Sequence, residues 1–523
     1  MSAQGGRWQA RASVTAWFDA RGPWGRRAVL GLLGGVCATG LAPVSLWPLA
    51  MLAWAAVFAL VARDGGFAAQ FGTGWAVGTG YFLVALNWIV EPFLVDVARH
   101  GWMAPFALIG LAGGLALFWG AAFWGAARVS RAHRIAALVV LLPLAEALRG
   151  WVFTGFPWAL IGHALISSPF AQAAAYVGPH GLSFVMLAIS AGIWLLITGR
   201  FARGALILFM AALLYGGGLQ RQAPLAEVPP AAPLLRLVQP NAPQHLKWDP
   251  AHMRTFYQRM RGFSALAGED GAVPDLVIWP ETALPVLLGN AAPTFADMVE
   301  ATGGVPILTG IQRFDGPRLF NSAVLIDGAG DVQALYDKHH LVPFGEYIPF
   351  GDALARIGIG AFAAQEGHGY SAGPGPRVLD FGAAGRGLML ICYEAVFARD
   401  MRSAPYADLA RPDYLLQLTN DAWFGNLSGP YQHLAQARLR AIEQGLPMVR
   451  VANTGVTALI GPRGRVLAQI PLGAAGYRDV RVPAPLPPTF YARFGDIPAY
   501  VLLIMMLTGL SVYAVFRRST DRD

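Results

Sequence analysis

Long runs of apolar residues fill the N-terminal part of the chain, and one more lies close to its C-terminal end. Residues 28–62 are almost all apolar, which is too long for one upright helix because about 20 residues cross a bilayer. Pro43 and Pro48 interrupt this run, so we predict a hairpin of two short spans at about 28–42 and 46–62. The other predicted spans bring the number to eight and cover about 69–91, 105–127, 135–151, 180–198, 203–217 and 499–516.

Arginines between the apolar runs predict the orientation of the chain in a membrane. If the N-terminus is cytoplasmic, every basic cluster falls on one side, as the positive-inside rule requires. The arginines concerned are Arg26, Arg27, Arg63, Arg128, Arg131, Arg134, Arg200, Arg203, Arg517, Arg518 and Arg522. The large polar segment at about 220–497 then emerges on the non-cytoplasmic side.

This polar segment alternates short β-rich runs with helix-like stretches, which is typical of an α/β domain. The predicted strands cover 234–239, 275–279, 306–311, 322–326, 388–391, 414–418 and 448–452. The predicted helices include 250–266 and 431–444. We interpret the proline-rich stretch 482–488 as a stiff linker to the last span.

Composition supports a membrane protein and argues against other classes. Hydrophobic residues make up 55% of the 523 residues, and charged residues only 13%, about half the share in a soluble domain. The net charge of +8 does not indicate nucleic-acid binding, because many arginines lie between apolar runs. There are two cysteines, Cys37 in an apolar run and Cys392 in the polar segment, so we expect neither a disulfide nor a zinc framework built on thiolates.

Two polar positions in this segment have catalytic potential besides the cysteine. Glu281 follows a predicted strand, although a helix-capping role explains it better when it is taken alone. Lys338 lies in a loop rich in proline and glycine that also contains Glu346, and such loops often bind ligands, although a solvated polar loop is the alternative. Adjacent side chains of an extended segment point to opposite sides, so we do not expect His339 and His340 to share a metal ion.

Cys392 ends the predicted strand 388–391, and residues 394–402 have the pattern of a following helix. Such a turn exposes the side chain and directs backbone N–H groups at a bound carbonyl oxygen. The helix N-terminus would also favour the thiolate over the thiol. A buried packing cysteine is the alternative when Cys392 is considered alone.

Together these residues can carry out acyl chemistry, because the carboxyl ends of strands collect at one edge of an α/β sheet. Glu281 can act as the base and later as the acid. Lys338 can lower the pKa of the Cys392 thiol and hold a developing oxyanion. The backbone N–H of Tyr393 can be a second oxyanion donor, and Glu346 can orient Lys338 or the base.

The motifs that carry these residues resemble the nitrilase superfamily, and within it the apolipoprotein N-acyltransferase family. They are Trp-Pro-Glu-Thr at 279–282, Tyr-Asp-Lys-His-His-Leu-Val-Pro-Phe-Gly-Glu at 336–346 and Ile-Cys-Tyr-Glu at 391–394. Similar strings occur at 155–158, 239–241, 419–425 and 432–433. The resemblance covers essentially the whole chain, including the layout of spans around one nitrilase-like domain.

The resemblance implies a four-layer αββα sandwich for residues 220–497 and a ping-pong acyl transfer in the bacterial inner membrane. An acyl chain, typically the sn-1 chain of phosphatidylethanolamine, would pass to Cys392 as a thioester. It would then pass to the α-amino group of the S-diacylglyceryl cysteine of an apolipoprotein. No cofactor and no metal are implied.

The resemblance also implies roles for individual residues. Glu281 would be the general base, Lys338 the oxyanion stabiliser and Cys392 the nucleophile. The supporting residues would be Glu346, Tyr393 and Glu394. The candidates for substrate binding are Trp248, Trp423, Phe424 and Trp158.

The expected organisation is a cytoplasmic segment at 1–25, a membrane domain of about seven spans at 26–219, a periplasmic catalytic domain at 220–497, and a last span with a cytoplasmic tail at 498–523. We expect a monomer. A membrane-tethered carbon–nitrogen hydrolase with water as the acceptor is an open alternative. A transporter is a weaker one, because it would place charged residues deep in several spans, and the predicted spans hold very few.

Overall fold

The chain forms two compact units. The computed structural model describes residues 16–61, 66–130, 133–223, 227–268, 271–347, 349, 369–403 and 411–520. Unit 1 comprises Met1–Phe93, Ala98–Gln220 and Asp496–Asp523, and unit 2 comprises Leu94–Val97 and Arg221–Gly495. Three of the arginines that predict the orientation, Arg63, Arg131 and Arg522, lie outside the described residues.

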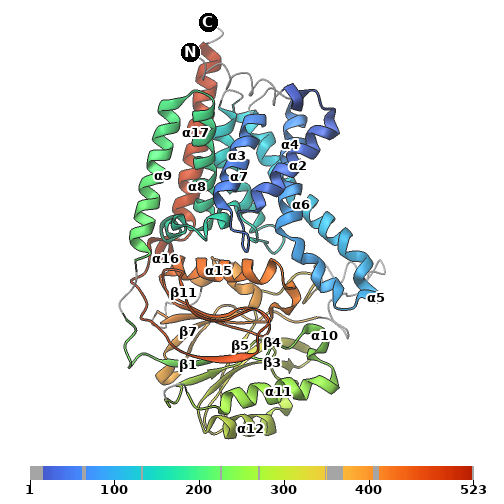
Figure 1. The fold of residues 1–523 in the computed structure, drawn as a ribbon, viewed down its shortest axis with the longest axis vertical. Coiled ribbons are helices and arrows are strands. Elements are labelled where there is room, and N and C mark those ends of the chain that lie inside the picture. The colour runs from blue at the N-terminus through green and yellow to red at the C-terminus, as the bar shows by residue number, and fades with distance from the viewer. Residues whose placement is uncertain are drawn as a thin grey trace. The chain divides into compact units, whose positions relative to one another are not determined.

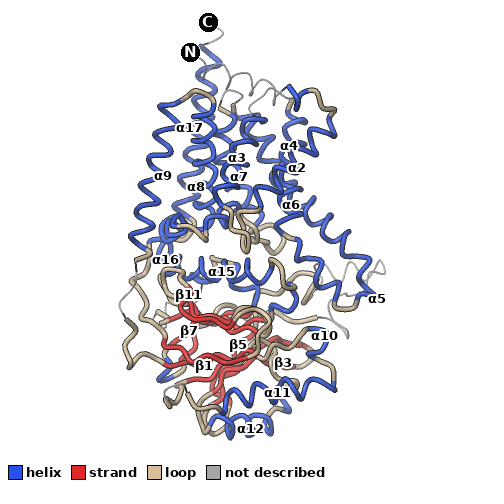
Figure 2. The backbone as a smooth tube through the Cα atoms, viewed as in Figure 1, coloured by secondary structure: helices blue, strands red, loops and turns tan. Residues whose placement is uncertain are grey.

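Unit 1 is built from helices (Figures 1 and 2), and each of the eight predicted spans overlaps one long helix, although the span predicted at 69–91 also runs into a second, short one. A helix suits such apolar segments because it satisfies its backbone hydrogen bonds internally. The long helices are α2 (Pro23–Ala38), α3 (Trp47–Val61), α4 (Phe67–Ala85), α6 (Ala104–Val129), α7 (Arg134–Arg149), α8 (Ala174–Ile197), α9 (Phe201–Arg221) and α17 (Ile497–Thr520). Short helices in the same part of the chain are η1 (Asn87–Leu94), α5 (Val97–His100), η2 (Gly101–Met103), η3 (Ile161–Leu165) and η4 (Pro169–Ala173).

Four helical segments of the described residues are long and apolar enough to cross a membrane, namely Val97–Val129, Pro169–Ile197, Phe201–Arg221 and Ile497–Arg517. Helix α4 and η1, which meet at a bend of 49°, form a fifth if they belong to one span. Helices α2 and α7 have 16 residues and α3 has 15, fewer than the about 20 that cross a bilayer upright. Length and composition therefore do not confirm eight spans.

Unit 2 contains two six-stranded sheets. The first has the order β12-β1-β2-β3-β4-β5, and its strands are β1 (Leu234–Gln239), β2 (Leu276–Ile278), β3 (Ile307–Asp315), β4 (Arg318–Ile326), β5 (Val332–Asp337) and β12 (Gly476–Arg481). The second has the order β11-β10-β9-β8-β7-β6, and its strands are β6 (Val378–Asp380), β7 (Arg386–Ile391), β8 (Tyr414–Thr419), β9 (Met448–Ala452), β10 (Thr457–Ile460) and β11 (Val466–Ile470). The three central strands of each sheet are parallel, and the outer strands pair antiparallel.

Helices cover the outer face of each sheet, so that unit 2 has the layer order αββα that the resemblance implies (Figures 1 and 2). On one side, Met260 of α11 (Pro250–Ala265) and Phe295 of α12 (Ala292–Thr302) share an apolar core with Val277 of β2. On the other side, Ala441 of α15 (Gly429–Gln444) packs with Leu415 of β8. The short helices of unit 2 are α10 (Gln244–Lys247), η5 (Leu288–Asn290), η6 (Gly382–Ala384), η7 (Cys392–Val396), α14 (Asp400–Ser403), η8 (Asp421–Phe424) and α16 (Phe490–Phe494).

Each of the seven predicted strands is present, with ends that differ from the prediction by at most four residues. Five strands were not predicted, namely β5, β6, β10, β11 and β12. Strand β6 has three residues and β10 has four, too few for a pattern to emerge. Strands β5, β11 and β12 lie at sheet edges, where most of their residues are exposed or only partly buried.

Arg236 of β1 forms a buried ion pair across the sheet with its register partner Asp479 of β12. Its Nε donates to Oδ1 and its Nη2 to Oδ2, both at 2.8 Å, and Arg236 is 1% exposed. Asp479→Asn leaves the buried guanidinium without its counter-charge. We expect a loss of about 3 kcal/mol of stability, measured as a lower thermal unfolding midpoint of the detergent-solubilised protein.

The matched control is Arg318→Gln, which breaks the pair between Arg318 and Asp315 in the same sheet. The N–O distance in this pair is 2.9 Å, against 2.8 Å in the buried pair, but its side chains are 59% and 54% exposed. Exposed pairs contribute about 0–1 kcal/mol, so the midpoint should barely move. Equal shifts in the two variants would contradict the assignment of stability to the buried pair.

Candidate active site

Glu281, Lys338 and Cys392 all lie just past the carboxyl ends of strands in unit 2. Lys338 directly follows β5, Cys392 directly follows β7, and Glu281 comes shortly after β2. Strands β2 and β5 run in the same direction within the first sheet, so their following loops emerge at the same edge. The prediction that these side chains collect at strand ends agrees with this placement.

The loop that carries Glu281 packs directly on the backbone of β3. Gly310 N donates to Pro280 O at 3.1 Å, and Ala283 N donates to Gly310 O at 2.9 Å. A Cβ atom at Gly310 would lie 2.3 Å from Thr282 N, so only glycine allows this approach. The contact holds the loop, and with it the position of Glu281, against the sheet.

The carboxylate of Glu281 accepts three hydrogen bonds inside unit 2. Lys338 Nζ lies 3.4 Å and Asn321 Nδ2 2.7 Å from Oε1, and Asn420 N lies 2.8 Å from Oε2. Lys338 Nζ also donates to Glu346 Oε1 at 2.8 Å. Glu281 is 6% exposed and Lys338 only 1%. The structure therefore brings together three of the predicted residues, Glu281, Lys338 and Glu346.

Lys338 is a buried cation. Burial alone would lower its pKa, but the carboxylates of Glu346 and Glu281 outweigh this effect and raise the pKa well above its usual value. Its ammonium group is therefore charged in the resting protein and can attract negative charge that develops next to it.

Three residues of this network had no predicted role. Asn321 lies within β4, where a single polar residue in a strand gave no signal. Asn420 stood in one of the family-like strings, but its backbone N–H cannot be singled out from sequence. Lys247 Nζ donates to Glu281 O at 3.2 Å and to Thr282 Oγ1 at 2.8 Å, and burial lowers its pKa to about 8 against the opposing effect of Glu281.

Cys392 is buried and has a φ of 50°, a left-handed conformation that costs energy in a residue other than glycine. Its thiol hydrogen-bonds with the Thr419 side chain. Burial and then Glu281 raise the pKa of the thiol, whereas Lys338 lowers it, and the net shift is upward. The resting group is therefore a thiol, which needs a base before it can attack a carbonyl carbon.

The predicted helix over residues 394–402 is wrong. Cys392–Val396 form the five-residue 3₁₀ helix η7, and α-helix begins only at Asp400 in α14. The effect of a helix dipole on the thiol therefore does not apply, because one short 3₁₀ turn sums few peptide dipoles. The sequence pattern missed this because the turn is decided by buried hydrogen bonds of Glu394 rather than by helical periodicity.

A fully buried polar cluster holds the backbone carbonyl of Cys392. The carbonyl accepts from Gln417 Nε2 at 2.9 Å and lies 3.1 Å from His433 Nε2. Arg450 donates to Gln417 Oε1 at 2.6 Å and also to Asp421 Oδ2, and Asp421 Oδ1 lies 2.9 Å from His433 Nδ1. Burial alone would raise the pKa of Asp421, but Arg450 and His433 lower it to about 2. The cluster fixes the strained turn at the cysteine.

Glu394 ties the turn after β7 to the loop after β5, as a supporting residue would. It is fully buried, and its Oε2 accepts from Ile391 N at 2.6 Å and from Tyr336 Oη at 2.8 Å. Its Oε1 accepts from the backbone N–H groups of His339 at 2.7 Å and His340 at 3.2 Å. One carboxylate thus sets the spacing of the loops that carry the lysine and the cysteine.

The four candidates for substrate binding have different surroundings. Trp248 and Trp423 are each 40% exposed, whereas Phe424 is buried with its ring against His433. Trp158 is fully buried in unit 1, with its ring 4.7 Å from that of Trp88. Within the described part of unit 2, Trp248 lines a small cavity beside the loop of the predicted base, together with Pro240, Ala242, Lys247, Met253, Phe256, Met260, Pro280, Ala283, Pro285 and Asn453.

Tyr393 is buried, and its ring lies edge-on to Phe397 with the centroids 5.0 Å apart. The side chain is thus part of the packing of the turn. The role of its backbone N–H as an oxyanion donor stays a prediction.

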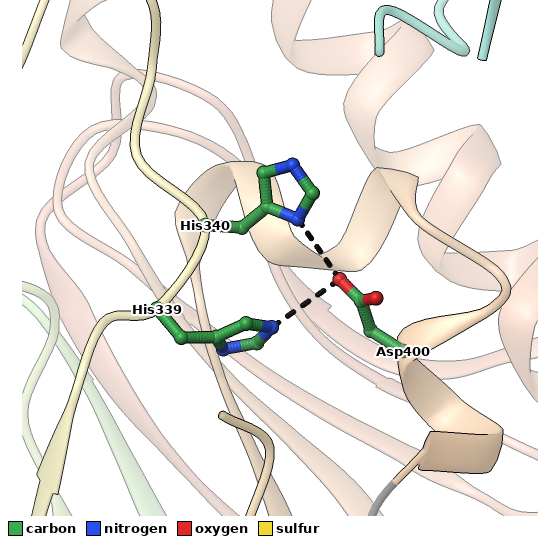
Figure 3. A group of neighbouring side chains, drawn as sticks. All are labelled: His339, His340 and Asp400. Atoms are coloured by element: carbon green, nitrogen blue, oxygen red, sulfur yellow. Dashed lines mark hydrogen bonds and ion pairs between the residues drawn. The ribbon is translucent and has the colours of Figure 1, made fainter. Parts of the chain in front are cut away.

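The expectation that His339 and His340 point apart is wrong (Figure 3). His339 Nε2 lies 3.3 Å and His340 Nδ1 3.0 Å from the same atom, Asp400 Oδ2. The segment is not an extended strand here, because the backbone N–H groups of His339 and His340 both donate to the same oxygen of Glu394. Burial alone would lower the pKa of His339, but Asp400 and Glu394 raise it to about 9.

Comparison with known proteins finds similarity to protein families in both units. The model of the apolipoprotein N-acyltransferase N-terminal domain matches residues 33–192, and that of carbon-nitrogen hydrolase matches residues 234–485. The apolipoprotein N-acyltransferase of Rhodopseudomonas palustris is 38% identical over 519 residues, which cover 93% of this chain and 96% of that protein. The one of Bradyrhizobium diazoefficiens is 38% identical over 528 residues, which cover 95% and 96%. A solved amidase from Nesterenkonia sp. has 19% identity and a TM-score of 0.35, over 50% of this chain and 94% of the amidase.

The two-sheet fold and the match at 234–485 place unit 2 in the carbon-nitrogen hydrolase class. The similarity to the curated relatives continues through the helical unit and covers more than nine-tenths of the chain. The chain therefore belongs to the apolipoprotein N-acyltransferase family. It is an acyltransferase built on a carbon-nitrogen hydrolase fold.

Glu394→Gln tests the link between the two loops. The amide keeps the shape of the side chain but turns one acceptor into a donor that faces backbone N–H groups, at a cost of about 1–3 kcal/mol. We expect acyl transfer to fall at least about tenfold, measured as the initial rate with a labelled acyl donor.

The matched control for this substitution is Glu300→Gln, on the exposed surface of α12. It makes the same chemical change without touching the loops, so its rate should equal that of the unmodified protein. A Glu394→Gln variant with an unchanged rate would show that the loops keep their spacing without this carboxylate.

Proposed function

We propose that the protein transfers an acyl chain from a phospholipid to the N-terminal amine of S-diacylglyceryl cysteine in apolipoproteins, through a thioester on Cys392. The donor is typically the sn-1 chain of phosphatidylethanolamine. The family to which the relatives belong, the resemblance of the motifs and the chemistry of the buried site all support this function.

In the first half-reaction, the Glu281 carboxylate takes the proton of the Cys392 thiol while the sulfur attacks the ester carbonyl carbon. Negative charge develops on the carbonyl oxygen, and the charged Lys338 stabilises it together with backbone N–H donors. When the tetrahedral intermediate collapses, the ester C–O bond breaks and Glu281 returns the proton to the leaving glycerol oxygen. The lysophospholipid departs and the thioester stays.

In the second half-reaction, the α-amine of the apolipoprotein attacks the thioester carbon. Glu281 accepts a proton from the amine, Lys338 again faces the oxyanion, and the C–S bond breaks as the amide forms. The proton returns to the sulfur, so that each cycle restores the starting protonation of both groups.

One observation carries this proposal, namely the hydrogen bond from buried Lys338 to the Glu281 carboxylate. The pair keeps an acceptor for the thiol proton and a cation for the oxyanion in one buried place, next to a thiol whose pKa is raised by burial. Glu346 supports it by holding the same ammonium group. Trp248, Trp423 and Phe424 are proposed to contact the lipid chains, and Trp158 to shape the helical unit that receives them.

The test of this function is mass spectrometry of the purified protein after mixing with phosphatidylethanolamine. We expect the mass to increase by one acyl chain located on Cys392. Addition of a diacylglyceryl-cysteine peptide should remove that mass and produce the N-acylated peptide. Cys392→Ala should abolish both signals, because no other described cysteine lies in unit 2.

The matched control is Cys37→Ala, which removes the other cysteine, buried in α2 of unit 1, and should leave both signals intact. Release of free fatty acid without N-acylated peptide would instead support the carbon–nitrogen hydrolase alternative, with water as the acceptor. A fully active Cys392→Ala variant would refute the mechanism itself.

We further propose that the eight helices predicted as spans all cross the bacterial inner membrane, with the polar segment on the periplasmic side. The clusters of arginine support this orientation. The chemistry supports it too, because a lipid chain drawn into water costs about 0.8 kcal/mol for each CH₂ group. A site next to the bilayer avoids that cost.

Cysteine labelling tests the orientation in a Cys37→Ala, Cys392→Ala background. Asp96→Cys and Arg200→Cys both place a thiol at an exposed position, in connections predicted to lie on opposite sides of the membrane. A membrane-impermeant thiol reagent should label Asp96→Cys in intact cells and Arg200→Cys only after lysis. The reverse pattern would invert the proposed topology.

A further inference from the structure

Two histidines and an aspartate form a compact cluster next to the candidate active site (Figure 3). His339 and His340 follow Lys338 directly, and Asp400 begins α14. One ligand atom of each side chain lies within 4.8 Å of the other two. Their side chains are 12%, 14% and 11% exposed, so the cluster is largely shielded from water.

Surrounding contacts fix the orientation of both imidazoles. His339 Nδ1 lies 2.6 Å from Glu394 Oε1 and 2.9 Å from Tyr336 Oη, which turns Nε2 towards Asp400. The His340 ring stacks on Phe397 with 3.5 Å between centroids and an interplanar angle of 12°. A carboxylate behind a histidine that faces a shared centre is the usual outer arrangement of a metal-binding imidazole.

We propose that His339 Nε2, His340 Nδ1 and Asp400 Oδ2 form a binding site for a divalent transition-metal ion of the Zn²⁺ class. Two imidazoles and one carboxylate are the donors that such ions prefer, and water completes a tetrahedral set. Ligands about 2.0–2.2 Å from a tetrahedral ion lie about 3.3–3.5 Å from one another. The nitrogen–oxygen separations of 3.3 and 3.0 Å are close to that spacing, so small side-chain movements suffice.

The charges around the cluster also suit a cation. The carboxylates of Glu394 and Asp400 face His339 from two sides. The positive charge of Arg399 opposes a cation, but it lies 3.7 Å from Oδ1 of Asp400, which is not the proposed ligand atom. Any proton on His339 Nε2 leaves to solvent when the lone pair binds the ion. The metal ion takes no part in acyl transfer in this proposal.

Such an ion would clamp two segments that the candidate active site needs in register. One segment continues from Lys338, and the other continues from the turn that contains Cys392 and Glu394. Bound metal would therefore stabilise the protein and hold the loops at their spacing. The inference does not depend on the proposed function, because metal binding is measured directly.

Zinc titration of the full-length, detergent-solubilised protein tests the site, after treatment with a chelator and dialysis. We expect one equivalent of Zn²⁺ by elemental analysis and a higher thermal unfolding midpoint on binding. Asp400→Asn and His340→Phe should each weaken Zn²⁺ binding at least about tenfold and remove the shift. The phenyl ring of His340→Phe retains a flat ring against Phe397. If Asp400→Asn fails to fold, the His340→Phe variant therefore still tests the site.

Two controls make the result specific. His252→Ala removes a partly exposed histidine that pairs with Asp249, outside the proposed cluster, and this variant should bind Zn²⁺ like the unmodified protein. Cys392→Ala should also keep its one equivalent, which separates the cluster from binding to the thiol. Absence of stoichiometric Zn²⁺, loss of it in Cys392→Ala, or unchanged binding in both cluster variants would overturn the proposal and leave an ion-pair network only.

Discussion

The buried ammonium group of Lys338 is the charge on which the rest of the site depends. Removing an ammonium ion from water costs several kcal/mol, and only close counter-charges offset this. Glu281 and Glu346 supply them at 3.4 and 2.8 Å. Both carboxylates must therefore reach the end of β5, which makes the loop after β2 and the loop that follows Lys338 converge there.

The second sheet also contributes to the stabilisation of the buried charges, through a backbone hydrogen bond. Asn420, just past β8, donates its backbone N–H to Glu281, so this carboxylate is hydrogen-bonded to segments of both sheets. The buried pair of Arg450 and Asp421 holds Gln417 and His433, which in turn contact the carbonyl of Cys392, a residue with a strained backbone. A half-satisfied network of this kind would be worse than an apolar core. These hydrogen bonds fix the backbone carbonyl of the turn that carries the thiol.

Glu394 connects this catalytic arrangement with the histidine cluster. Its two oxygens bind the strand end before Cys392 and the backbone after Lys338, and one of them also faces His339. Any charge that binds at the cluster acts on the same carboxylate that spaces the loops. This shared group is the physical reason why the proposed metal ion would matter for stability near the site.

Much of this protein was determined by its sequence alone. Apolar runs predict a helix at each expected span, and short β-rich runs predict seven of the strands. Strand-end positions predict Glu281, Lys338 and Cys392 as one site, and the structure brings the first two into contact. Tertiary structure alone decided the partners that come from distant segments, such as Asn321, Asn420 and Lys247, because a hydrogen bond across the fold leaves no local pattern. It also replaced the helix expected after Cys392 with a 3₁₀ turn and turned His339 and His340 to one side, since the buried carboxylate of Glu394 outweighs local backbone preference there.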